Sequence, residues 1–158
     1  MDERKWIERI LAGDTQSFSC LVAKYEKMAY TIALRILENR EEAEEAVQDA
    51  FVKMYRALSD FHFDSKFSTW FYRIVYRTAL TALRQQRMFV SYEEAGPVDL
   101  SNDEVESATA LLEREDRKEM IARTLKKLPA DEALLLTLYY LEECSVEEIC
   151  QITELSAS

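Results

Sequence analysis

Residues 39–59, NREEAEEAVQDAFVKMYRALS, carry the clearest helix signal in this sequence. Asn39, followed three residues later by Glu42, matches a helix N-cap with an acidic residue that returns to the cap. Apolar residues then recur at intervals of three and four: Ala43, Ala46, Val47, Ala50, Phe51, Met54, Tyr55 and Leu58. The stretch therefore predicts an amphipathic helix that runs to about Ser59.

The same spacing continues on both sides of this stretch. Breaks at residues 12–17, 38–40 and 59–68 divide the first half of the chain into four helices. The second helix, around residues 18–37, has its own apolar stripe of Phe18, Leu21, Val22, Tyr25, Ala29, Ile32, Ala33 and Ile36. Because only two glycines and two prolines interrupt 158 residues rich in helix formers, the sequence predicts an all-α protein.

Residues 91–107, SYEEAGPVDLSNDEVES, interrupt the helical pattern. They gain acidic residues and contain one proline and one glycine, which is typical of a linker. We therefore predict two small helical domains, residues 1–90 and 110–158, joined by an acidic linker over 91–109. The helices expected in the second domain cover 111–127, Pro129 to about Tyr140, and a short segment capped by Ser145 with Glu148 three positions on.

The net charge of −10 is unevenly distributed. Residues 1–90 hold 14 basic and 13 acidic side chains, whereas residues 91–158 hold 6 basic and 17 acidic ones, a net −11. This asymmetry indicates two parts with different partners. The charged start MDERKWIERI does not suit a signal peptide, and no apolar run has the ~18 residues of a membrane span. We expect a cytoplasmic protein without membrane insertion.

Residues that carry chemistry are sparse, so we expect no catalytic site, no metal and no cofactor. The three cysteines are too scattered for a disulfide framework and are interpreted as small core residues. The single histidine, His62, lies near Asp60 and Asp64, but a lone histidine is a poor metal site. Because no glycine-rich phosphate loop and no nucleophile with base and orienting group is present, a non-enzymatic role is expected.

Residues 66–87, KFSTWFYRIVYRTALTALRQQR, contain five basic and five aromatic residues and no acidic one. On a helix with ~100° per residue, Arg77, Arg84 and Arg87 fall within about 40° of Arg73, with Trp70 and Tyr76 at the edges of this stripe. Guanidinium groups edged with aromatic rings suit a single DNA strand, although a solvated basic face explains the same pattern. The preceding loop, residues 59–68, supplies short polar side chains and favours the DNA interpretation.

The helix over residues 39–59 has a second, mixed face opposite its core stripe. Its members recur at helical intervals and are Glu45, Gln48, Asp49, Val52 and Arg56. A valine among polar residues is typical of a docking surface, whereas a solvated face explains the charges. The pattern alone leaves both interpretations open.

These segments resemble the extracytoplasmic-function group of the sigma-70 family of bacterial RNA polymerase sigma factors. Residues 39–51, NREEAEEAVQDAF, are similar to the region 2 helix that docks on the clamp of the largest polymerase subunit, with Gln48 and Asp49 at its strongest positions. Residues 67–74, FSTWFYRI, resemble the promoter-melting motif, and the loop before them corresponds to the segment that captures a flipped minus-ten base. The DNA-binding residues that we expect are Asp64, Ser65, Lys66, Phe67, Thr69, Trp70, Arg73, Arg77 and Arg84.

The second domain resembles region 4, the helix-turn-helix that recognises the minus-thirty-five element, through Leu128-Pro129, residues 140–145 and residues 147–149. Glu143 and Glu154 stand where glycines are common, and glutamate disfavours positive φ. The chain ends at Ser158, about where the recognition helix would begin, so we expect this chain not to recognise that element, although family lengths imply a longer natural protein.

The resemblance implies a sigma factor that binds core RNA polymerase and melted promoter DNA, and that is held by an anti-sigma factor until a signal releases it. The alternative is a helical protein-interaction module or transcriptional regulator without promoter-melting activity, with the acidic half as its docking surface.

Overall fold

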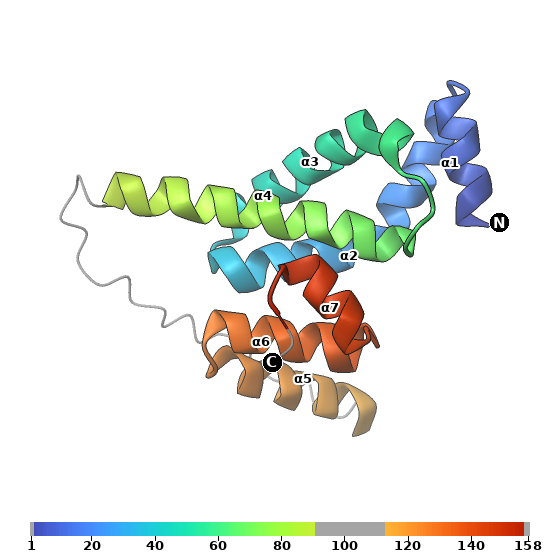
Figure 1. Cartoon of the computed structure of the whole chain (residues 1–158). Helices are drawn as coiled ribbons and strands as arrows, with labels where there is room; N and C mark the ends of the chain where they lie inside the picture. The colour runs from blue at the N-terminus through green and yellow to red at the C-terminus, as the bar shows by residue number, and fades with distance from the viewer. Residues whose placement is uncertain (1, 91–112, 157–158) are drawn as a thin grey trace.

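The computed structural model describes residues 2–90 and 113–156, and every regular element in these ranges is helical, as the composition predicts (Figure 1). The elements of the first range are α1 (Glu3–Leu11), α2 (Thr15–Leu37), α3 (Arg40–Ala57), the short 3-10 turn η1 (Leu58–Asp60) and α4 (Phe67–Val90). Those of the second are α5 (Glu113–Lys126), α6 (Ala130–Leu136), the π-helical turn η2 (Thr137–Leu141) and α7 (Val146–Thr153). The predicted linker over 91–109 and the last two residues of the chain, about where the recognition helix of the resembled family would begin, lie outside the described residues.

The first domain is built around mutual contacts of α2, α3 and α4, with α1 packed on α2. Phe71 of α4 is fully buried, and its ring centroid lies 4.8 Å from that of Phe51 and 5.9 Å from that of Tyr25. The predicted stripe of α3 is buried except for Tyr55, which is 47% exposed. Tyr55 was expected in the core, but it lies at the margin and packs edge-on against Phe18, with centroids 5.2 Å apart.

At the starts of α3 and α2, the local sequence pattern predicts some features of the helix start correctly and misses others. The Asn39 side chain accepts a hydrogen bond from the Glu42 backbone N–H at 3.1 Å, which confirms the cap of α3. The Glu42 carboxylate does not return to the cap as predicted; it accepts a hydrogen bond from the Gln86 side chain and so links α3 to α4. Helix α2 begins at Thr15, earlier than predicted, because Asp14 caps it and accepts from the Ser17 hydroxyl at 2.9 Å.

The second domain packs against the first. Helix α6 contacts α2 and α7 contacts α4 (Figure 1). The side chains of Leu134, Leu138, Ile149 and Ile152 are buried in the same hydrophobic cluster as the core of the first domain. The domains on either side of the predicted linker therefore share one hydrophobic core.

Helix α7 has the capping box that the sequence predicts. Ser145 accepts from the Glu148 backbone N–H at 3.2 Å, and the Glu148 carboxylate accepts from the Ser145 backbone N–H at 2.8 Å. The predicted strain is also present, since Glu143 has a φ of 52° and Glu154 a φ of 61°. Within the described ranges, no helix combines the length and the apolar character needed to cross a membrane.

Glu38, which ends α2, has a φ of 54° and so lies in the left-handed region that favours glycine. We expect Glu38→Gly to raise the free energy of unfolding by about 0.5–1 kcal/mol, because relief of strain exceeds the added entropy of the unfolded chain. Urea denaturation of the full chain measures this. Glu44→Gly, inside α3, should instead lower the free energy of unfolding by about 1 kcal/mol. An equal loss of stability in both variants would contradict the strain assigned to Glu38.

Candidate nucleic-acid interface

The arginines of α4 lie on its exposed side. Arg73, Arg77, Arg84 and Arg87 are all exposed, whereas Phe71 and Val75 on the opposite side are fully buried. A helix places residues four apart on one face, so Arg73 and Arg77 present adjacent guanidinium groups. The structure thus separates a basic surface from an apolar one along the same helix, as the spacing predicts.

The aromatic residues of α4 do not all lie on this surface. Trp70 is partly exposed, and its ring lies 5.0 Å from Phe61 and 5.7 Å from Phe67, centroid to centroid. Phe67 and Thr69, both expected to contact DNA, are each only 4% exposed, so their side chains belong to the core. Tyr76, expected at the edge of the stripe, is also buried. Trp70 is therefore the aromatic residue of the motif that can still reach a base.

The loop before α4 is anchored at its apolar residues. Phe61 is buried and its ring packs at a tilt against that of Phe63, with centroids 4.7 Å apart, and the Arg4 guanidinium of α1 lies 4.9 Å from the Phe63 ring centroid. Asp64 and Lys66 remain exposed beyond these anchors, and Ser65 is partly exposed. His62 is exposed too, and no group of three potential metal ligands occurs in the described part of the chain.

The basic surface carries acidic partners from the second domain, which sequence reasoning missed. The Lys66 ammonium lies 2.9 Å from Glu148, the Arg73 guanidinium donates to Glu154 at 2.8 Å, and the Arg77 guanidinium donates to the same Glu154 oxygen. These contacts hold the pKa of both carboxyl groups below the ordinary value, Glu154 chiefly through Arg77 and Glu148 chiefly through Lys66. The residues are about 80 positions apart, so no local pattern could have paired them.

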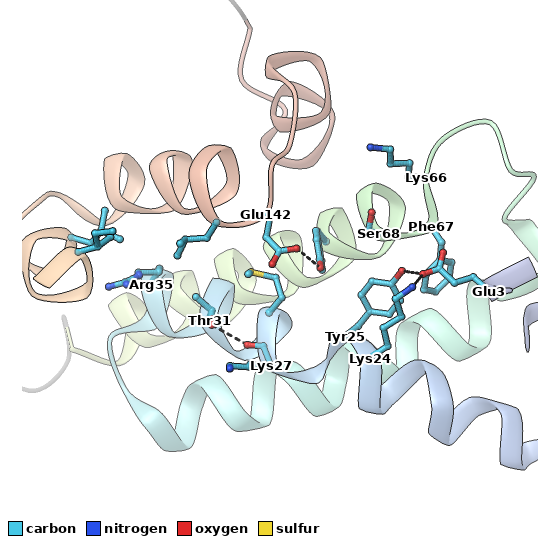
Figure 2. Close-up of a pocket in the computed structure, with 15 residues that line it drawn as sticks. Glu3, Lys24, Tyr25, Lys27, Thr31, Arg35, Lys66, Phe67, Ser68 and Glu142 are labelled. Atoms are coloured by element: carbon cyan, nitrogen blue, oxygen red, sulfur yellow. Dashed lines mark hydrogen bonds and ion pairs between the residues drawn. The ribbon is translucent and has the colours of Figure 1, made fainter. Parts of the chain in front are cut away.

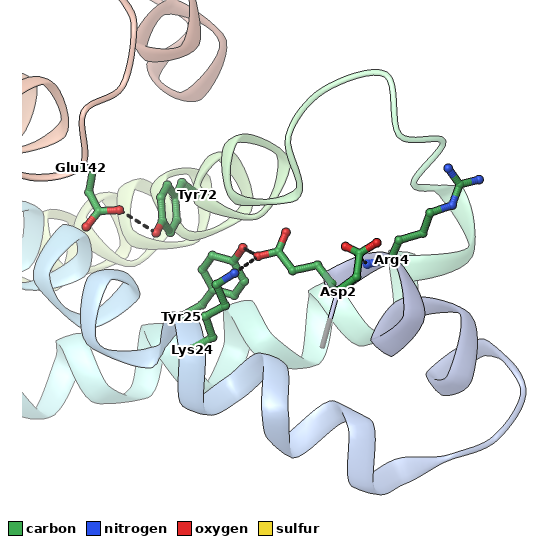
Figure 3. Close-up of polar contacts among 7 residues, drawn as sticks. Asp2, Arg4, Lys24, Tyr25, Tyr72 and Glu142 are labelled. Atoms are coloured by element: carbon green, nitrogen blue, oxygen red, sulfur yellow. Dashed lines mark hydrogen bonds and ion pairs between the residues drawn. The ribbon is translucent and has the colours of Figure 1, made fainter.

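A further contact joins the domains beside this surface. The Tyr72 hydroxyl donates to the Glu142 carboxylate at 3.1 Å (Figure 3). Burial raises the pKa of Tyr72, and the negative charge of Glu142 adds to that rise. Tyr72 therefore stays a neutral donor. On α2, Tyr25 is held similarly by Glu3, which Lys24 also contacts.

A pocket of about 800 Å³ opens between the two domains (Figure 2). Its walls come from α2, the start of α4, α5 and η2, and mix cationic groups with apolar side chains such as Ile121 and Leu125. Arg35 lines it, and burial lowers the pKa of its guanidinium. In the described residues no carboxylate pairs with Arg35, so this wall offers a cation to a partner.

The second predicted surface lies on α3. All five of its residues are exposed, namely Glu45, Gln48, Asp49, Val52 and Arg56. Their side chains make no hydrogen bond or ion pair within residues 2–90 and 113–156. Val52 is 47% exposed at the centre of the set, beside the exposed Tyr55. This polar surface with an apolar centre suits a protein partner.

The sequence matches known families along both domains. The family described as Sigma-70 region 2 matches residues 21–88, and that described as Sigma-70, region 4 matches residues 118–158. The RNA polymerase sigma-H factor of Pseudomonas aeruginosa is 32% identical, with 96% of this chain and 82% of that protein covered. The ECF RNA polymerase sigma-E factor of Escherichia coli (strain K12) is 31% identical, with 94% and 81% covered.

Two solved structures resemble the fold. An engineered region 2 of sigmaE in complex with GTAAAA is 34% identical, with a TM-score of 0.53 over 57% of this chain and 94% of that one. CnrH in complex with the cytosolic domain of CnrY has a TM-score of 0.63 over 98% of this chain and 84% of that one. At 21% identity, the second likeness shows the fold alone.

The lowered pKa of Glu154 gives a test of the interdomain contacts. Because the folded pKa lies below the ordinary 4.5, the stabilisation from this pairing is present above about pH 4.5 and is lost as the pH falls through the lowered value. We expect Arg77→Ala to raise the pKa of Glu154 toward 4.5, as followed by NMR titration of its carboxyl carbon. Arg84→Ala, which removes a charge that Glu154 does not contact, should leave that pKa in place; an equal rise in both variants would contradict the pairing.

Proposed function

Because this chain belongs to the extracytoplasmic-function group of the sigma-70 family, and is thus an RNA polymerase sigma factor that directs transcription initiation at promoters, we propose that it works through two separate surfaces of its first domain. The α3 surface docks on the clamp of the largest polymerase subunit, and the α4 surface holds the melted minus-ten strand. The observation that carries this proposal is the exposed arginine row of α4, next to Trp70 and opposite a buried core.

The DNA surface in this proposal consists of Lys66, Trp70, Arg73, Arg77 and Arg84, with Asp64 and Ser65 in the loop. Phe67 and Thr69 act from within, by fixing the start of α4. Separating DNA strands costs on the order of 1.4 kcal/mol per step, and stacking a base on an aromatic ring returns ~1–3 kcal/mol. One partly exposed indole and several guanidinium groups can therefore stabilise a short melted segment. The likeness to a sigmaE region 2 solved with GTAAAA supports a single strand as the ligand.

The remaining roles in this proposal follow from the resemblance. The protein performs no catalysis itself, acts in the cytoplasm and leaves RNA synthesis to the polymerase. An anti-sigma factor restrains it by contacting both domains. The pocket between the domains supports such a partner, because its apolar walls and the unpaired Arg35 suit an amphipathic segment that carries a carboxylate.

The DNA surface is tested with core polymerase and forked minus-ten DNA by fluorescence anisotropy. Trp70→Ala should weaken binding by about 1–3 kcal/mol, which is roughly 5- to 150-fold. Arg84→Ala should reduce the slope of log affinity against log salt by about 0.7, since one phosphate contact is lost. Lys5→Ala removes an exposed charge from α1 and should change neither value. Unchanged affinity and slope in the α4 variants would favour an interaction module that binds no DNA.

The docking surface is tested by binding of the full chain to core polymerase without DNA. We expect Gln48→Ala and Asp49→Ala each to weaken binding about tenfold or more, because desolvated polar anchors at an interface centre cost more than 1 kcal/mol. Both side chains are exposed, so the melting temperature should stay unchanged. Glu44→Ala, on the same helix but outside the set, is the control. Equal affinities in all three variants would place the docking surface elsewhere.

A further inference from the structure

The loop before α4 is held from α1 by a cation–π contact. The Arg4 guanidinium lies 4.9 Å from the centroid of the Phe63 ring, and Phe63 directly precedes the loop residues 64–66. We propose that Arg4 and Phe63 are positioning residues, which fix this loop and the Trp70 indole for the melted strand without contacting DNA themselves. This role rests on the proposed function of the α4 surface and extends it to α1.

The backbone at Phe63 needs support from its side chain. Phe63 has a φ of 59°, in the left-handed region that bulky residues rarely adopt. Such a conformation persists only where the surrounding contacts fix it. Here the ring makes those contacts, because it packs at a tilt against the buried Phe61 and has the Arg4 guanidinium over it. The direction in which the chain leaves Phe63 toward α4 therefore depends on a ring held from two sides.

Ring contacts continue from Phe63 to the indole that is proposed to stack on a base. Phe61 lies between the two, with its centroid 4.7 Å from that of Phe63 and 5.0 Å from that of Trp70. Phe61 is only 6% exposed, so it is closed to DNA. Closely packed side chains transmit displacements to their neighbours. A shift of the Phe63 ring therefore disturbs the packing of Trp70 through Phe61.

Arg4 can hold the ring because α1 is itself fixed. The buried Ile7 and Ile10 anchor this helix, which packs on α2 and also contacts the η1 turn before the loop. From the first turn of α1 the Arg4 side chain extends toward the loop (Figure 3). Its Nε donates to the Glu8 carboxylate at 3.2 Å, which orients the guanidinium beside the ring. The contact thus joins the loop to a helix anchored in the core.

The exposure of Arg4 sets the size of the expected effect. Its side chain is 65% exposed, and a cation–π pair at an exposed site changes an equilibrium constant about two- to fivefold. Loss of the contact should therefore weaken DNA binding without abolishing it. An exposed arginine can also contact a phosphate directly, but only a phosphate contact adds to the salt dependence of binding. The salt slope therefore separates positioning from direct contact.

The test uses the full chain with core polymerase and forked minus-ten DNA, followed by fluorescence anisotropy. We expect Arg4→Ala to weaken DNA binding about two- to fivefold and to leave the slope of log affinity against log salt unchanged. Lys5→Ala is the matched control, because it removes an exposed positive charge from the same turn of α1, and it should change neither value. Equal losses in the two variants, or a slope reduced by about 0.7 in Arg4→Ala, would overturn the inference.

Substitutions of the ring test the pairing itself. Phe63→Leu should weaken binding at least as much as Arg4→Ala does, and Arg4→Ala should add nothing in the Phe63→Leu chain, because the contact is already lost. Phe63→Tyr keeps a ring for the cation and should retain the natural affinity. An Arg4→Ala loss of undiminished size in the Phe63→Leu chain would mean that Arg4 acts independently of the ring, which contradicts the positioning role.

Trp70→Ala in the same assay separates this role from the proposed function. If Trp70→Ala leaves DNA binding unchanged, the proposed DNA surface is wrong and the positioning role falls with it. If Trp70→Ala weakens binding but Arg4→Ala behaves like Lys5→Ala, only the positioning role is wrong.

Discussion

The burial of Phe71 between α2 and α3 is the contact on which the rest of the structure depends. Its ring packs against those of Tyr25 and Phe51 and lies nearly parallel to that of Phe67, so this one side chain of α4 links α2, α3 and the first turn of its own helix. Helical side chains have fixed angular spacing, and burying Phe71 together with Val75 therefore turns Arg73 and Arg77 outward. Loss of such a ring to alanine typically costs ~3–5 kcal/mol, so this packing fixes α4 strongly. The chemistry of the basic surface is thus set by an apolar contact on the other side of the helix.

The same core also orients the exposed α3 residues for which a docking role is proposed. Ala46, Ala50 and Met54 face α2 and α4, which leaves Gln48, Asp49 and Val52 on the outside. The link between Glu42 and Gln86 ties the first turn of α3 to the far part of α4. The shared core and this link fix the orientation of the two surfaces relative to each other, so under the proposed function a polymerase bound to α3 would also orient the α4 surface.

The sequence predicted what depends on local spacing and missed what depends on contacts between distant segments. The helical stripes, the Asn39 cap and the Ser145 capping box follow from residues within one or two turns, and all are present. Phe67 and Tyr76 share a helix with the arginines, but Phe67 packs against the rings of Tyr25 and Phe61, and the buried Tyr76 lies near Asp131 and Glu154 of the second domain. Tyr55 shows the reverse, because it has the spacing of a core residue yet is exposed and packs only edge-on against Phe18 near the start of α2. Glu154 and Arg73 are 81 residues apart, so neither the sequence around Glu154 nor that around Arg73 predicts their pairing.

Two carboxylates of the acidic second half, those of Glu148 and Glu154, form ion pairs with basic residues of the first domain. A left-handed backbone at a non-glycine residue costs about 1–2 kcal/mol, and three glutamates of this protein adopt it: Glu38, Glu143 and Glu154. Strain alone therefore does not mark a functional residue here, since the side chains of Glu38 and Glu143 make no ion pair within the described residues. What distinguishes Glu154 is that the left-handed turn after α7 sets its carboxylate against two arginines of another domain. A glycine there would ease the turn but would leave Arg73 and Arg77 without this carboxylate, so the strained turn of the second domain keeps an acidic partner on the basic surface of the first.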